Sequence, residues 1–340
     1  MCDRCMDRCA ARLWQPLALG FVVLLSACGG DDAGGSDAGV ADARWEPAFD
    51  TSEAGTLSAV WGSGPSDVFI VGGEDERGEI YHYDGASWEP MDVPSGVPFL
   101  VWVYGFGPDD VYAVGRQGAV IHYDGEAWTA LDSGSSAELW GVFGFSADDL
   151  WMVGEGEDGT PEILHYDGAA FTEHELDENP RQARALLKVW GIDGRLVAVG
   201  ENGTIAEYTD GSWSVVSTGA EATESFVSVW GTGADNLVAV GGETRAQVAT
   251  SDGGGWETTR FSQDPALNGS FVDDPDLAIV VGLEGFMGRY DIATGELIRE
   301  PGDARLRLHS VWGDGQGRYY GVGGTFFSPH EGEAYVRVID

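Results

Sequence analysis

The chain has 340 residues, and 18 basic residues against 57 acidic ones give a formal net charge of −39 at pH 7. Such a charge excludes nucleic acid and anionic lipid surfaces as partners of the folded domain, and leaves cations, basic proteins and neutral glycans. Hydrophobic residues make up 43% of the chain and glycine contributes 52 residues, which excludes a disordered or mainly helical protein. The acidity also has a simpler explanation, a surface that stays soluble in salt.

The first 27 residues have the composition of a targeting segment. Three arginines precede the apolar stretch LALGFVVLL (17–25), whose nine residues fall short of the roughly 20 that span a bilayer. The stretch ends in Leu25-Ser26-Ala27-Cys28, which resembles the lipobox of bacterial lipoproteins. The resemblance implies a signal peptide over 1–27 that is cut before Cys28, and a Cys28 that carries the lipid anchor. Met6 is an alternative start of the chain.

Cys28 is the only cysteine that remains after this cleavage, because the other three lie within residues 1–27. We therefore expect neither disulfides nor a cysteine metal site in the mature protein. Residues 28–42 consist of the anchor cysteine and an acidic Gly/Asp/Ala-rich tether, which lacks the apolar residues of a core. Gly29 follows the cysteine, where an aspartate would be a signal for retention in the inner membrane. We therefore expect the protein to be anchored in the outer membrane, where it faces either the periplasm or the outside.

One sequence unit recurs seven times in the remainder of the chain. Its most regular feature is a Val-Gly pair about every 40 residues. The glycines of these pairs are Gly72, Gly115, Gly154, Gly200, Gly241, Gly282 and Gly323. An aromatic-Gly pair precedes the Val-Gly pair by about ten residues in six copies, and the sixth copy departs from this rule with Val272 at the glycine position.

Most copies contain four strand signals. An apolar strand that ends in aromatic-Gly is followed by a second apolar strand that ends in Val-Gly, and an alternating strand then leads into an Asp-Gly turn and a strand that opens with an aromatic residue. In this turn the glycine supplies the positive φ that tight hairpins require. Four antiparallel strands repeated seven times predict an all-β, seven-bladed β-propeller with four-stranded blades over residues 43–340.

The two ends of this domain complement each other. The seventh copy stops after its third strand, and residues 43–49 (ARWEPAF) have the pattern of a missing fourth strand. We therefore expect the N-terminal strand to close the last blade, which removes an exposed sheet edge.

The repeats resemble several known propeller families. Gly72-Gly73, Gly241-Gly242 and Gly323-Gly324 are similar to kelch repeats, and TSDGGGW (250–256) is similar to the Asp-box turn of sialidase-type and photosystem-assembly-factor propellers. The whole of 43–340 resembles repeat lipoproteins of myxobacteria. These resemblances imply a secreted propeller and no particular activity.

Residues capable of chemistry recur with the repeat, which favours structural roles. His82, His122 and His165 occupy equivalent positions in three copies, so we expect the ring to hold them apart and not around a metal. Aspartates before the second strand of a copy (Asp67, Asp110, Asp149 and Asp235) are expected to bond local backbone amides. No cofactor motif is present, and calcium has no recognisable loop. On the innermost strands the charged residues and histidines are Lys188, Asp273, Arg307 and His309.

Divergent loops at one face of the ring are the predicted binding region, because repeated scaffolds place function where copies differ. Long loops are expected at 74–79, 155–162, 177–185, 217–225 and 325–333. The predicted ligand-contacting residues are Phe326, Phe327, His330, Arg77, Arg181, Arg184 and Glu155. The expected function is that of a monomeric, lipid-anchored scaffold that binds a protein or a glycan. The alternatives are a sialidase-like hydrolase or lyase, which needs an arginine and carboxylate cluster at one mouth of the channel, and an envelope assembly factor.

Overall fold

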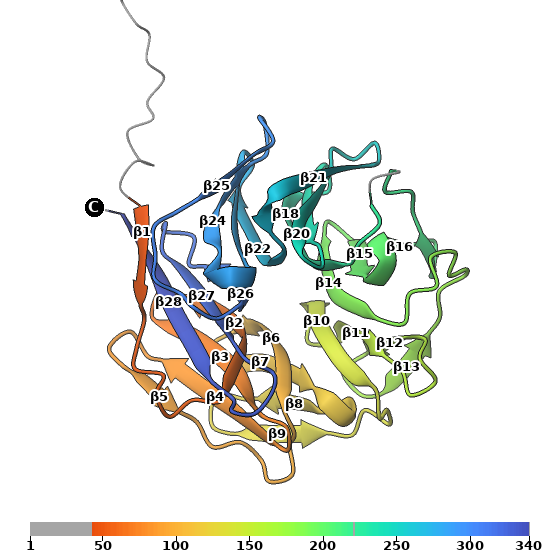
Figure 1. Cartoon of the computed structure of the whole chain (residues 1–340). Coiled ribbons are helices and arrows are strands. Elements are labelled where there is room, and N and C mark those ends of the chain that lie inside the picture. The colour runs from red at the N-terminus through yellow and green to blue at the C-terminus, as the bar shows by residue number, and fades with distance from the viewer. Residues whose placement is uncertain (1–42, 220–221, 340) are drawn as a thin grey trace, which may run out of the picture. The chain divides into compact units, whose positions relative to one another are not determined.

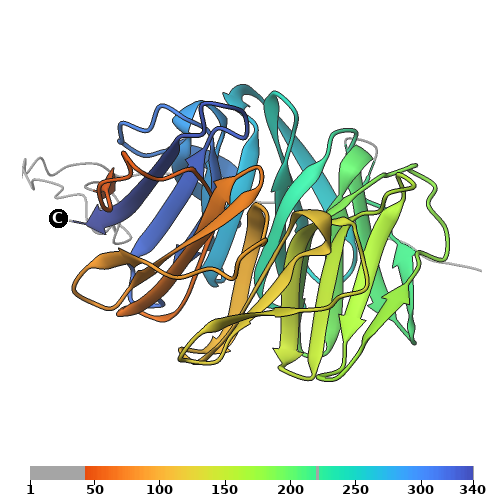
Figure 2. The same cartoon turned by 90° about the horizontal axis from the view of Figure 1, so that it is seen from below.

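A computed structural model describes residues 43–219 and 222–339, and these residues form a ring of seven four-stranded antiparallel sheets (Figure 1). The predicted seven-bladed propeller is therefore confirmed. Figure 2 shows the ring edge-on, with strands crossing from one face to the other. The predicted signal peptide and tether, 1–42, lie outside the described residues. Within the described part of the chain, no helix is long and apolar enough to cross a membrane.

Each blade runs from an innermost strand beside the channel to an outermost strand at the rim. Blades 1 to 3 consist of β2 (Thr56–Gly64), β3 (Asp67–Glu74), β4 (Arg77–Tyr83) and β5 (Trp88–Pro90); β6 (Leu100–Gly107), β7 (Asp110–Gly115), β8 (Val120–Tyr123) and β9 (Trp128–Leu131); and β10 (Glu138–Ser146), β11 (Asp149–Glu155), β12 (Pro161–Tyr166) and β13 (Phe171–His174).

Blades 4 to 7 continue the same order. They consist of β14 (Leu186–Ile192), β15 (Arg195–Gly200), β16 (Thr204–Thr209) and β17 (Ser212–Val215); β18 (Phe226–Gly233), β19 (Asn236–Gly241), β20 (Arg245–Ser251) and β21 (Trp256–Pro265); β22 (Leu267–Asp274), β23 (Leu277–Gly282), β24 (Met287–Asp291) and β25 (Glu296–Arg299); and β26 (Leu308–Gly313), β27 (Tyr319–Gly324), β28 (Gly332–Ile339) and β1 (Ala43–Pro47). Short 3₁₀ turns join the second and third strands of blades 2, 4 and 6: η1 (Arg116–Gly118), η2 (Glu201–Gly203) and η3 (Leu283–Gly285).

The N-terminal strand closes the ring as predicted. β1 pairs with β28 from Ala43 opposite Ile339 to Pro47 opposite Tyr335. Trp45 is 3% exposed, and its indole Nε1 donates to the Glu300 carboxylate at 3.0 Å. Arg337 of β28 donates two hydrogen bonds of 2.7 Å to the same carboxylate. The closing strand is therefore held by a buried charged network as well as by its backbone.

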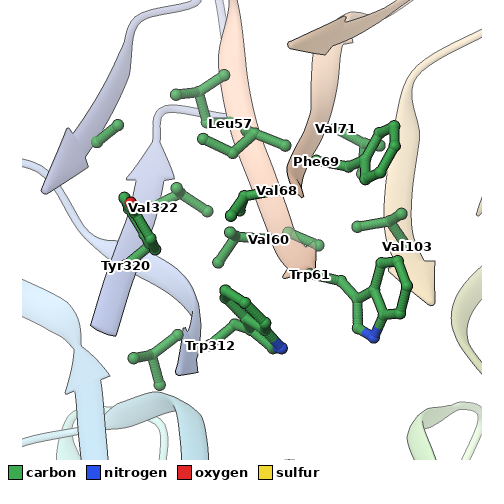
Figure 3. Packing of buried hydrophobic residues seen from close by; sticks show 14 of the residues in the cluster. Leu57, Val60, Trp61, Val68, Phe69, Val71, Val103, Trp312, Tyr320 and Val322 are labelled. Carbon is green, nitrogen blue, oxygen red and sulfur yellow. The ribbon is translucent and has the colours of Figure 1, made fainter. Parts of the chain in front are cut away.

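A closed belt of seven aromatic rings, one from each innermost strand, explains the aromatic-Gly pairs. Successive ring centroids along the belt lie 4.9–6.4 Å apart, from Trp61 through Tyr104, Phe143, Trp190, Trp230 and Phe271 to Trp312. Trp312 then abuts Gly62 of blade 1, where an added Cβ would lie 2.7 Å from the indole. Figure 3 shows Trp61 and Trp312 among the buried hydrophobic residues of this part of the core. Phe271 shows that the sixth copy keeps its aromatic ring and changes only the glycine, to Val272.

Two predictions about local structure are wrong. The expected loop at 74–79 is a two-residue turn, because Glu74 still pairs with Arg77. Gly73 permits this at a φ of +131°, where a Cβ would lie 2.0 Å from the Arg77 carbonyl. By contrast, the loops between β11 and β12 and between β27 and β28 are long, as expected.

The second wrong prediction concerns the main partners of three aspartates before the second strands, Asp67, Asp110 and Asp149. Of these, Asp67 also interacts with the local backbone amide of Ser63, and the prediction for Asp235 stays a prediction. The three carboxylates face the histidines of the third strands: Asp67–His82 at 2.7 Å, Asp110–His122 at 2.8 Å and Asp149–His165 at 2.9 Å. The register explains this, since the start of each second strand lies beside the end of the third. Each imidazole also packs on an aromatic ring of its own blade at 4.4 Å. Among the described residues, no three metal-ligating side chains come together.

Candidate binding site at the channel mouth

Every innermost strand contains, near its start, one residue that breaks the register with the second strand. This residue lies four positions before the glycine of the aromatic-Gly pair or, in blade 6, before Val272. The unpaired residues are Ser58, Val101, Trp140, Leu187, Val227, Asn268 and His309. Two residues of one strand face a single residue of its neighbour here, which defines a β-bulge and turns the extra side chain out of the regular alternation.

All seven bulged residues line one pocket at the mouth of the channel. Trp102, Arg307 and Phe326 complete its lining. The pocket has a volume of about 180 Å³. A protein cavity of about 150 Å³ accepts a benzene molecule, so this pocket fits one ring-sized group. The bulges occur near the starts of the innermost strands, so the pocket opens at the face that carries the divergent loops.

His309 is a neutral hydrogen-bonding group in this lining. Burial, with a smaller contribution from the nearby Arg307 charge, lowers the pKa of His309 to about 4, although the hydrogen bond to Gly324 acts in the opposite direction. Nε2 lies 3.1 Å from the Gly324 carbonyl oxygen, which can only accept, so Nε2 donates and Nδ1 is the acceptor of the neutral ring. The imidazole packs against Phe326 with ring centroids 4.3 Å apart.

Three other polar side chains line the pocket with different roles. Asn268 donates its amide to the Leu308 carbonyl at 2.9 Å, which leaves its side-chain oxygen available. Ser58 directs its hydroxyl at carbonyls of blades 1 and 2 and so contributes to the scaffold. Arg307 is exposed and has no side-chain partner among the described residues, so its guanidinium is available to a ligand.

Lys188 and Trp102 occupy the channel one residue beyond the bulges. The equivalent residues of the other blades are small: Ala59, Gly141, Ser228, Gly269 and Ser310. Lys188 is 2% exposed, and its Nζ lies against the indole face of Trp102. Burial lowers the pKa of Lys188 well below its usual value. Within the described part of the chain, neither Lys188 Nζ nor the buried Trp140 Nε1 has a hydrogen-bond partner.

Of the seven predicted ligand-contacting residues, only Phe326 lines this pocket. Phe327 follows it and is 81% exposed. His330 lies 3.2 Å from the Thr56 hydroxyl and borders a separate groove beside β1. Arg77 forms an ion pair with Glu79 at 2.6 Å.

The other three predicted residues belong to the loops of blades 3 to 5. Arg184 pairs with Glu155. Arg181 donates to the carbonyls of Asn202 and Ala222 and to the Thr218 hydroxyl, so its guanidinium joins neighbouring loops. This guanidinium is therefore part of the scaffold.

The bulged residues do carry a sequence signal. Aligned on the aromatic-Gly pair, the fourth preceding position reads Ser, Val, Trp, Leu, Val, Asn and His. The residue before it is Leu or Phe in every copy and the residue two places after it is Val in six copies, whereas the residue directly after it varies as well. Of the residues predicted on the innermost strands, Lys188, Asp273 and His309 lie there, whereas Arg307 directly precedes β26. Arg307 and His309 line the pocket, whereas Asp273 accepts from Tyr319 at 3.0 Å beyond the aromatic belt. No carboxylate occurs among the described residues that line the pocket.

Comparison with known proteins identifies the fold. No protein-family model and no curated protein sequence matches the chain. A solved structure described as YCF48 bound to D1 peptide aligns with a TM-score of 0.65 at 15% identity, over 88% of this chain and 97% of that one. YCF48 from Cyanidioschyzon merolae aligns with a TM-score of 0.63 at 13% identity, over 86% and 98% of the two chains. The WD40 propeller domain of Doa1 aligns with a TM-score of 0.65 at 11% identity, over 86% and 96%. The chain thus has the propeller fold that binding and interaction scaffolds commonly use.

Proposed function

We propose that this protein is a lipid-anchored envelope protein whose propeller binds a protein segment at the channel mouth, with one ring-sized side chain of that segment inserted into the pocket. The convergence of seven bulged residues carries this proposal. The scaffold around them repeats, yet the seven side chains differ and together form one mainly apolar pocket with a few polar groups. This combination is typical of ligand sites.

A peptide ligand matches the polar groups around the pocket. His309 Nδ1 and the Asn268 side-chain oxygen can accept from backbone N–H groups, and Arg307 can donate to carbonyl oxygens. One of the similar solved structures, YCF48 bound to D1 peptide, is a propeller in complex with a peptide, which supports a ligand of this class. The hydrolase alternative receives no such support, because glycosidases generally need two carboxylates beside the scissile bond and the described lining has none.

The negative net charge of this protein favours a ligand segment that carries basic residues near the inserted side chain. The chain carries a net charge of −39, so a partner with basic residues near the insertion point associates faster, and this steering weakens with salt. Cys28 supplies the membrane attachment in this proposal, with 28–42 as its tether and the outer membrane as its location. Labelled palmitate should enter the wild-type protein in its native host and should not enter Cys28→Ser.

A pocket-filling variant tests the binding proposal. Val227→Trp places a large ring in the pocket, whereas Phe327→Ala changes an exposed residue on the neighbouring loop. Linear peptides would be selected from a display library on the wild-type protein and then measured by calorimetry against both variants. We expect Val227→Trp to weaken binding at least tenfold and Phe327→Ala to change it less than twofold.

Indole serves as an independent probe in saturation-transfer NMR. It should bind the wild-type protein and compete with the selected peptides. Peptides that bind Val227→Trp as well as the wild type would refute the pocket as the site.

A further inference from the structure

Lys188 is the only lysine in the chain, and it lies inside the channel. It follows the bulged Leu187 on β14, is 2% exposed, and packs its Nζ against Trp102, which lines the pocket. No described residue accepts a hydrogen bond from this amine. A second buried donor without a partner, the Trp140 indole N–H, belongs to the lining of the same pocket.

The fold does not require an amine at this position. The equivalent residue is small in five of the other six blades, and Gly141, the nearest of these, would place a Cβ only 3.1 Å from the Lys188 Cα. A methionine has nearly the same length and no polar atom, so it would fill the space without an unpaired buried donor. An isolated buried amine next to a pocket is therefore better explained by what it can react with than by packing.

A lysine amine is nucleophilic only in its uncharged form, and the surroundings of Lys188 favour that form. Burial lowers its pKa well below the usual value, and the described lining offers no carboxylate to hold the ammonium form. The other ionisable groups in the lining, Arg307 and His309, are a cation and a neutral ring and add no negative charge. An exposed lysine, by comparison, is uncharged in only about one molecule in 2,500 at pH 7.

We propose that Lys188 captures a ring-sized apolar aldehyde in the channel pocket as an imine. The volume of about 180 Å³ and the lining by Trp102, Trp140 and Phe326 fit a flat aromatic group. Trp140 lines the pocket and its indole N–H has no partner among the described residues, so a bound carbonyl oxygen would satisfy this donor. This activity goes beyond the capture of a protein segment and does not depend on it.

The reaction needs no reagent other than the aldehyde. The Nζ lone pair forms a C–N bond to the carbonyl carbon, and the oxygen takes up the proton that the nitrogen releases, which gives a carbinolamine. Loss of the hydroxyl group together with the remaining amine proton, as water, leaves the C=N bond. Trp102 covers Nζ and also lines the pocket, so movement of its indole admits the aldehyde, and Trp102→Ala should react faster than the wild type.

Reductive trapping tests the proposal on the full mature chain. The protein would be incubated with benzaldehyde at pH 7.0, reduced with cyanoborohydride and analysed by peptide mapping, which separates Lys188 from the terminal amine. The matched control is the double variant Lys188→Met/Arg77→Lys, which carries its only lysine at an exposed position of the same face. We expect Lys188 to be labelled at least tenfold faster than the lysine at position 77.

Labelling of Lys188 no faster than that of the exposed lysine would overturn the proposal. Circular dichroism of both proteins shows whether each remains folded during the reaction. The peptide-binding test is separate, because Lys188→Met keeps the bulged lining and should still bind the selected peptides.

Discussion

At the residue scale, Lys188 is a buried amine that has no hydrogen-bond partner among the described residues. Lys188→Met removes the desolvation of an unpaired amine and keeps the side-chain volume, so the variant should be more stable by about 1–3 kcal/mol at pH 7. Urea denaturation of the two proteins measures the difference. Arg77→Lys, at an exposed position where the positive charge beside Glu79 is kept, should change stability by less than about 0.5 kcal/mol. A less stable Lys188→Met would show that the amine has a partner.

His309 should make the fold sensitive to mild acid. Its pKa is about 4 in the folded protein against an ordinary value of 6.5, so the unfolded chain binds the extra proton between these values. Stability is therefore fully present above pH 6.5 and falls as the pH approaches 4. His309→Gln should remove up to about 3 kcal/mol of this loss. Chemical denaturation of the wild type and of His309→Gln at pH 7.5 and pH 4.5 measures this difference. Equal losses of unfolding free energy in the two proteins would contradict the role of His309.

The aspartates show which residue roles can be predicted from sequence. The Asp-Gly pattern predicts a hairpin turn at Asp84, and this carboxylate accepts hydrogen bonds from Ala86 N at 2.8 Å and Ser87 N at 3.0 Å. Both partners are within three residues, so the local sequence contains all the information. The prediction for Asp67 misses a main partner, because His82 is 15 residues away and reaches it only through strand register.

At the element scale, the aromatic belt explains why a glycine follows the aromatic residue. Gly105→Ala would place its Cβ 2.7 Å from the Trp61 ring and 2.7 Å from the Asp110 carbonyl oxygen. Overpacking of this kind costs about 1–3 kcal/mol, so the melting temperature should fall. Gly107→Ala is the matched control on the same strand, since its nearest neighbour would lie 3.6 Å away. If both substitutions lowered the melting temperature equally, the aromatic belt would not limit how closely neighbouring blades pack.

The bulges mark the limit of sequence-based prediction for single strands. Alternation of apolar and polar residues predicts which face of a regular strand is buried, but every innermost strand is buried along most of its length. In a strand that is buried on both faces, a β-bulge does not change the pattern of apolar residues and so cannot be detected from it. It becomes detectable only when the seven copies are aligned and the variable position is seen to recur, as with Trp140 and His309.

At the scale of the whole molecule, ring closure should determine stability. Trp45→Ala removes a buried indole and leaves Glu300 without one of its donors, which should cost about 3–5 kcal/mol. Deletion of residues 43–50 removes β1 entirely, exposes the edge of β28 and should unfold or aggregate the domain. Calorimetry and light scattering measure both effects. A deletion variant that melts at the wild-type temperature would refute closure by β1.

The architecture is predictable because repetition averages out local ambiguity. Seven approximate copies determine blade number, strand count and the closing strand, even though the loop at 74–79 is predicted incorrectly. The pocket is largely unpredictable for the opposite reason. It is assembled from one residue of each blade, and these residues become neighbours only after the ring closes, so Phe326 is the single predicted ligand-contacting residue found in it.

The course of β1 has a consequence for orientation. The chain enters β1 at Ala43, opposite Ile339 at the far end of β28, and leaves at Pro47 toward the face with the divergent loops. The first described residue, Ala43, and the end of β28 therefore both lie at the face opposite the pocket. No end of the described chain obstructs the channel mouth, so a large partner can reach it past the divergent loops alone.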